Sequence, residues 1–120
     1  MNLLGHDYYC DRSDAGIGLS RTASLIAQAR SEAAAIGATT LLLDNGDGLQ
    51  GTPLGDQPDA GEQHPLMRAF QELKYDAIGL GNHDFNYGIE TLSQILGNAP
   101  CPVICSNMTA QDDTTRLPFV

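Results

Sequence analysis

The sequence predicts an α/β fold, built of layers, in which three parallel-type strands alternate with three helices. Two observations predict it. Three segments with helical periodicity alternate with three short runs of apolar, β-compatible residues, and glycine- and acid-rich loops follow the first two runs. Helices that alternate with short apolar strands are typical of a parallel sheet covered by crossover helices.

The first predicted helix is amphipathic, and Gly37 ends it because glycine tolerates a left-handed cap. Its apolar positions recur at helical spacing: Thr22, Leu25, Ile26, Ala29, Ala33 and Ile36. Residues 39–43 then form a short apolar run, which predicts a buried parallel strand. Residues 44–62 are rich in glycine, proline and acids, and they predict a long loop.

Pro65 opens the second predicted helix at the position that proline favours, with His64 beside it. We expect Leu66, Ala69, Phe70 and Leu73 to form the buried stripe of this helix. The remaining predicted elements are a strand at residues 76–80, a loop at 81–88, a helix at 89–96 and a strand at 102–105.

Length and charge limit the possible functions. The chain has 120 residues, which is one domain at most. Its 15 acidic and 6 basic residues give a net charge of -9, which argues against a nucleic-acid partner. A small phosphate ester held through a metal ion is still allowed, because a divalent cation reverses the local charge. No apolar run approaches the ~20 residues of a membrane helix, and the first ten residues do not resemble a signal peptide. The three cysteines are expected to be free thiols.

The two loops are expected to meet in space. Each follows a predicted parallel strand, and right-handed crossovers place such loops at the carboxyl edge of the sheet, where ligands bind in α/β folds. The first loop carries Asp47, a hard oxygen donor able to ligate one metal ion or bridge two. An ordinary turn is the alternative for this loop, because Asp, Asn and Gly are common turn residues. A calcium-binding EF-hand is excluded because Gly55 occupies the twelfth position from Asp44.

The second loop carries Asn82, His83 and Asp84 in succession. Asn82 offers a neutral oxygen to a metal, and His83 could donate a proton to a leaving alkoxide. Asp84 could orient the His83 imidazole, as the acid of a catalytic triad does. A turn with an exposed histidine is again the alternative. Together, the two loops hold the side chains of a metal-assisted phosphoester hydrolase.

These motifs resemble a known family. GD followed downstream by GNHD is similar to the central motifs of the calcineurin-like metallophosphoesterases. DYY at 7–9, QGTPLGD at 50–56, HP at 64–65 and YDAIGLGNHDFNYG at 75–88 narrow the resemblance. They resemble the amino-terminal catalytic domain of bacterial bifunctional 2',3'-cyclic-nucleotide 2'-phosphodiesterase/3'-nucleotidases, over nearly the whole chain.

The resemblance implies a layered metallophosphoesterase-type fold and a site with two divalent metal ions, whose identity among zinc, manganese, iron and cobalt stays open. Asp47 matches the carboxylate that bridges both ions, and Asn82 matches the amide ligand of the second. His83 matches the histidine that protonates the leaving oxygen or stabilises charge on the phosphoryl group, with Asp84 as its orienting partner. The implied reaction is in-line attack by a metal-bound hydroxide on the phosphorus of a small nucleotide. The family is mostly periplasmic or extracellular.

The chain also departs from this pattern. The family's Asp-x-His motif on the first strand and its later metal histidines have no counterpart in residues 1–120, and His6 and His64 do not match ligand positions. We therefore expect a partial catalytic domain that needs the rest of a parent enzyme to complete its site and is inactive alone. A 5'-nucleotidase fragment, a non-catalytic α/β binding module and a purely structural fragment are the alternatives.

Overall fold

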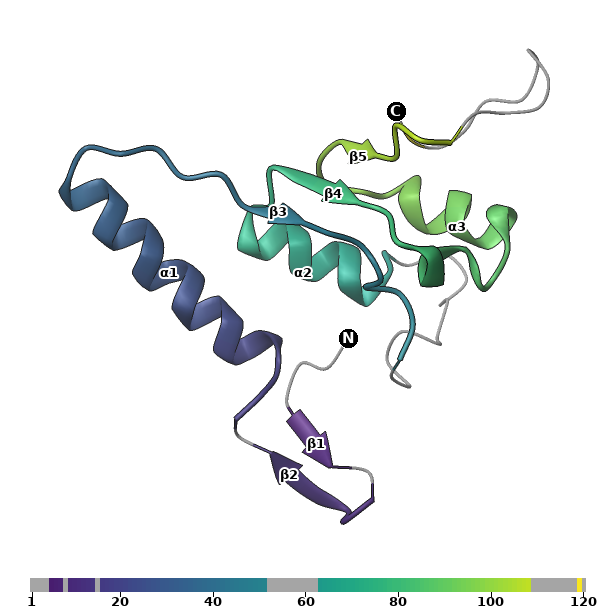
Figure 1. Cartoon of the computed structure of the whole chain (residues 1–120), viewed down its shortest axis with the longest axis horizontal. Coiled ribbons are helices and arrows are strands. Elements are labelled where there is room, and N and C mark those ends of the chain that lie inside the picture. The colour runs from purple at the N-terminus through teal and green to yellow at the C-terminus, as the bar shows by residue number, and fades with distance from the viewer. Residues whose placement is uncertain (1–4, 8, 15, 52–62, 109–118, 120) are drawn as a thin grey trace. The chain divides into compact units, whose positions relative to one another are not determined.

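The structure is a computed structural model that describes residues 5–7, 9–14, 16–51, 63–108 and 119 (Figure 1). It divides into two compact units, residues 1–41 and residues 42–120. Residues 52–62, which make up most of the predicted long loop, lie outside the described residues. None of the helices described in these ranges is both long and apolar enough to cross a membrane.

The second unit contains the predicted parallel sheet. Its strands are β3 (Leu43–Asp44), β4 (Ala77–Gly79) and β5 (Val103–Ile104), in the order β3-β4-β5. Both pairings are parallel, with Asp44 opposite Ile78 and Ile78 opposite Val103. Each successive strand lies on the same side of the strand before it. Right-handed crossovers therefore place the two connecting helices on the same face of the sheet (Figure 1). The α/β prediction is confirmed.

The two crossover helices begin and end close to where the sequence predicts. α2 spans Pro65–Leu73 and α3 spans Ile89–Leu96. His64 is the N-cap of α2, where its imidazole Nδ1 accepts a hydrogen bond of 3.2 Å from the Leu66 backbone N–H. His64 is only 5% exposed, so its position beside Pro65 serves to begin the helix.

The hydrophobic core of the described residues lies between the sheet and these helices. Its buried members are Leu49, Leu66, Met67, Phe70, Ile78, Leu92, Ile95, Leu96, Val103 and Cys105. The predicted stripe of α2 is confirmed for Leu66 and Phe70, whereas Ala69 and Leu73 are only partly buried. Met67 was not predicted, although it is 1% exposed. The stripe is therefore wider than predicted, because α2 faces both the sheet and the loop that carries Leu49.

The first predicted strand is wrong in its extent and its burial. β3 contains two residues rather than five, and Leu43 is 62% exposed. The pleat explains the burial: Asp44 shares the helix-covered face with Ile78 and Val103, whereas Leu43 points to the opposite face. None of the helices of the second unit covers that face within the described residues.

The first unit contains a hairpin and the first predicted helix. β1 (Gly5–Asp7) pairs antiparallel with β2 (Arg12–Asp14), and neither strand was predicted, because these six residues are mostly polar. α1 (Leu19–Ala35) confirms the helix, and Gly37, at φ 70°, ends it in a cap in which the Ala38 N–H bonds to the Ala33 carbonyl. No residue of α1 is buried, so its predicted apolar stripe lies exposed or partly exposed.

Candidate active site

The two loops predicted to meet are in direct contact. The His83 backbone N–H donates a hydrogen bond of 2.9 Å to Oδ1 of Asp47, across 36 residues of sequence. This contact follows from the fold, because β3 and β4 are neighbouring parallel strands and both loops leave from their carboxyl ends. The expected convergence of Asp47 with the Asn82–His83 pair at one edge of the sheet is confirmed.

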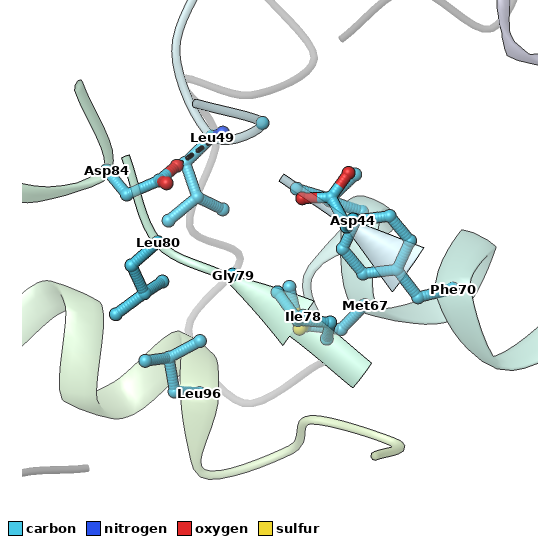
Figure 2. A pocket seen from close by; sticks show the side chains of 11 residues that line it. Asp44, Leu49, Met67, Phe70, Ile78, Gly79, Leu80, Asp84 and Leu96 are labelled. Atoms are coloured by element: carbon cyan, nitrogen blue, oxygen red, sulfur yellow. Dashed lines mark hydrogen bonds between the residues drawn. The ribbon is translucent and has the colours of Figure 1, made fainter. Parts of the chain in front are cut away.

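The Asp84 carboxylate joins the two loops and is 2% exposed. Its Oδ2 accepts hydrogen bonds from the backbone N–H groups of Asp47 at 2.8 Å and Gly81 at 2.9 Å. Its Oδ1 accepts a third, from the Leu49 N–H at 3.0 Å (Figure 2). All three of these bonds come from backbone donors, and the expected role of Asp84 in orienting the His83 imidazole stays a prediction. Asp84 fixes the spacing of the two loops.

Two small residues let the loop backbones approach so closely. Gly46 has φ 88°, and a Cβ there would strike the backbone of Leu80 and Gly81. A Cβ at Gly81 would collide with the Asp47 carboxylate and lie 2.8 Å from the Asp47 nitrogen. Asp47 itself has φ 60°, a left-handed conformation that aspartate tolerates better than most residues. The loop geometry thus explains why glycines flank the candidate chemical groups.

Asn82 and His83 begin a short 3-10 helix, η1 (Asn82–Phe85), and both side chains are exposed. The Asn86 amide nitrogen lies 3.0 Å from Nδ1 of His83. The same nitrogen donates a hydrogen bond of 2.6 Å to Oε1 of Gln50, on the first loop. Neither Asn86, the partner of the His83 ring, nor Gln50, the partner of Asn86, was predicted from the sequence. The spacing of three residues between His83 and Asn86 could have revealed their contact, because side chains three residues apart in a 3-10 turn lie one above the other.

A small pocket lies beneath the loops, lined by residues of α2, α3, β4 and the first loop (Figure 2). Its lining is mainly apolar, with Asp44 and Asp84 as its two carboxylates. Burial raises the pKa of Asp44, the nearby Asp84 charge raises it further, and a hydrogen bond from the Gly46 N–H opposes both. Because its lining is apolar and its two charged groups are carboxylates, this pocket does not suit a negatively charged phosphate. It is part of the hydrophobic core that supports the two loops.

The donor atoms on the loops match part of a metal site. Asp47 offers a carboxylate oxygen and Asn82 a neutral amide oxygen, the hard donors that suit divalent ions, and several hydrogen bonds hold their loops together. In the ranges that the structure describes, no group of three or more His, Cys, Asp or Glu side chains is arranged to hold a metal ion. The chemistry of the Asp47 and Asn82 oxygens is compatible with two of the ligands that a divalent metal ion needs.

No known protein-family profile matches the chain. The chain is 39% identical to the trifunctional nucleotide phosphoesterase protein YfkN of Bacillus subtilis (strain 168) over 129 residues, covering 99% of this chain and 8% of that protein. It is 42% identical over 123 residues to the 2',3'-cyclic-nucleotide 2'-phosphodiesterase/3'-nucleotidase of Salmonella typhimurium, covering 98% of this chain and 18% of that protein. The chain thus spans less than a fifth of the length of these curated relatives.

The fold has a close match among solved structures. The crystal structure of the calcineurin-like phosphoesterase YfkN from Bacillus subtilis superposes with a TM-score of 0.76 and 41% sequence identity, over 86% of this chain and 32% of that one. The chain belongs to the calcineurin-like phosphoesterase family, with bacterial 2',3'-cyclic-nucleotide 2'-phosphodiesterase/3'-nucleotidases among its relatives.

Proposed function

We propose that this chain is part of the catalytic domain of a metal-dependent phosphoesterase that hydrolyses 2',3'-cyclic nucleotides and 3'-nucleotides. The observation that carries the proposal is the hydrogen bond between the His83 N–H and Asp47 Oδ1, which unites the candidate metal ligand and the candidate acid. The relatives that are named as nucleotide phosphoesterases and 2',3'-cyclic-nucleotide 2'-phosphodiesterase/3'-nucleotidases support the substrate class. The site acts on small nucleotides in the periplasm or outside the cell, and it requires the remainder of the parent enzyme.

Each residue has a distinct part in this proposal. Asp47 and Asn82 hold the metal centre, whose ions, when bound, polarise the phosphoryl group and neutralise its charge. His83 stands beside that centre and either donates a proton to the leaving oxygen or a hydrogen bond to a phosphoryl oxygen. Asp84 does not contact the substrate in this scheme. It keeps Asp47 and His83 at the spacing that the reaction needs, through the Asp47 and Gly81 amides.

The chain alone is proposed to be inactive, because Asp47 and Asn82 are two ligands, whereas a catalytic zinc commonly takes three protein ligands and a water. The decisive experiment replaces the aligned segment of the Salmonella enzyme with this chain. The hybrid is assayed with bis(p-nitrophenyl) phosphate, 2',3'-cyclic AMP, 3'-AMP and 5'-AMP, beside the isolated 120-residue chain. We expect turnover of the first three substrates by the hybrid and none by the isolated chain.

His83→Ala in the hybrid tests the role of the imidazole, and Asp47→Asn tests the metal centre. Loss of a general acid lowers the rate by roughly 10²–10⁴-fold. Glu72→Gln, on the exposed side of α2, is the matched control and should leave turnover unchanged. A folded hybrid without activity would indicate a non-catalytic module, and a preference for 5'-AMP would indicate a 5'-nucleotidase. Turnover by the isolated chain would contradict the proposed incompleteness.

A further inference from the structure

The His83 imidazole is held from both loops. Asn86 follows it by three residues on the second loop and contacts its Nδ1 at 3.0 Å, while Gln50, on the first loop, accepts from the same Asn86 nitrogen at 2.6 Å. Asn86 and Gln50 have no part in the proposed function. They are nevertheless the side chains that the structure bonds to His83 and, through Asn86, across the loops.

The donor and acceptor properties of these groups determine where the imidazole proton lies. An amide nitrogen carries two hydrogens and can only donate, whereas Oε1 of Gln50 can only accept. One hydrogen of Asn86 therefore goes to Gln50, which leaves the second for Nδ1 of His83. Rotating the Asn86 amide by a half-turn would set its oxygen against Oε1 of Gln50, two acceptors facing one another. With both amides in the orientations that the structure gives, Nδ1 accepts through its lone pair and the neutral ring carries its proton on Nε2, whereas turning both amides together would put the proton on Nδ1.

We propose that Gln50 and Asn86 are positioning residues that fix the orientation of His83 and hold its neutral ring as the Nε2–H tautomer. This inference rests on the proposed function for its purpose, and it narrows the role of His83 within it. A ring with Nδ1 occupied as an acceptor offers one hydrogen-bond donor, Nε2–H, to a phosphoryl oxygen of the substrate. His83 then acts by stabilising charge on the phosphoryl group rather than by releasing its proton to the leaving oxygen.

A carboxylate in the place of the Asn86 amide would reverse the direction of the hydrogen bond at Nδ1 of His83. A carboxylate can only accept, so it selects the Nδ1–H tautomer, as the aspartate of a Ser-His-Asp triad does. Asn86→Asp therefore reverses the hydrogen-bond direction at Nδ1 with almost no change of shape. Gln50→Glu preserves the acceptor that Asn86 needs, whereas Gln50→Ala removes it. These three substitutions separate hydrogen-bond direction from mere occupancy of space.

The test is nitrogen NMR of the histidine rings in the ¹⁵N-labelled 120-residue chain, recorded at alkaline pH so that the rings are neutral. In the native chain we expect Nδ1 of His83 to resonate as an unprotonated nitrogen, with a scalar coupling to the Asn86 amide nitrogen across the hydrogen bond. Asn86→Asp should move the proton to Nδ1. Gln50→Glu should keep the native tautomer, and Gln50→Ala should weaken or abolish the coupling.

The control is Gln71→Ala, an exposed glutamine of α2, which should leave the His83 resonances unchanged. A protonated Nδ1 in the native chain would overturn the proposal, and so would an Asn86→Asp variant that keeps the native tautomer. The measurement needs neither metal nor substrate, so its failure is distinguishable from failure of the proposed function. An inactive hybrid enzyme with the expected tautomers would reject the phosphoesterase and retain the positioning role.

Discussion

Removing the Asp84 carboxylate should separate the two loops, and the cost can be worked from its three hydrogen bonds. The carboxylate is 2% exposed and accepts from the amides of Asp47, Gly81 and Leu49. A hydrogen bond to a charged group contributes about 1.5–3 kcal/mol, although water can replace part of it where the donors are only partly buried. We therefore expect Asp84→Ala to lower the unfolding free energy by about 3–5 kcal/mol, out of a typical ~5–15.

Asp84→Asn makes the prediction sharper because it changes no volume. Its amide oxygen can still accept from Asp47 and Gly81, but its amide nitrogen would face the Leu49 N–H, donor against donor. We expect a loss of about 1–3 kcal/mol, between the native chain and the alanine variant. Urea unfolding measures the stability of the native chain and of both Asp84 variants. Far-ultraviolet circular dichroism is the suitable signal, because the chain has no tryptophan whose fluorescence could be followed.

Glu72→Gln provides the control for removing a charge, since Glu72 is exposed on α2 and its neutralisation should cost no more than about 0.5 kcal/mol. Amide hydrogen exchange at Leu49 and Gly81 gives a second, local measurement, and both amides should lose protection in Asp84→Ala. If both Asp84 variants unfold at the same urea concentration as Glu72→Gln, Asp84 does not hold the loops together and our assignment of its role is refuted.

Three further predictions concern other parts of the chain. Asp44→Asn should be more stable than the native chain at pH 7. Burial raises the pKa of Asp44 in the folded state above its ordinary 3.8, so the native chain loses folding stability as the pH rises above 3.8 and the buried carboxyl group ionises. Below about pH 4 the carboxyl group is protonated in both the folded and the unfolded state, and the advantage of the variant should vanish. Equal stability at both pH values in denaturant titrations would contradict this. Gly81→Ala should cost about 1–3 kcal/mol and weaken Asp47-dependent turnover of the hybrid, whereas Gly97→Ala, where a Cβ meets nothing nearer than 3.4 Å, should be nearly neutral. Iodoacetamide should label the exposed Cys10 first, Cys101 second and the buried Cys105 last, as followed by mass spectrometry. Cys101 should react slowly because burial and the charges of Asp76 and Asp44 raise the pKa of its thiol. Rapid labelling of Cys105 would show that the core opens.

Much of the fold could be predicted because its signals are local. The proline at the start of α2, the eight residues of α3 and the glycine that ends α1 depend on neighbours within a few positions. The meeting of the two loops was also predictable, because successive parallel strands with right-handed crossovers must bring their carboxyl ends to one edge. The amino-acid sequence alone was therefore enough to predict the order of elements, the parallel sheet and the convergence of the loop that carries Asp47 with the loop that carries Asn82 and His83.

The hydrogen-bond partners of those side chains could be found only from the packed, three-dimensional arrangement of the chain. Asp84 stands next to His83 in the chain, yet its carboxylate turns to the amides of Asp47 and Leu49, which are 37 and 35 residues away. The His83 ring pairs instead with Asn86, which Gln50 holds from the other loop. The physical reason is that a buried carboxylate must find donors wherever the packed backbone presents them. Composition and spacing show which groups are available, and packing selects the partners.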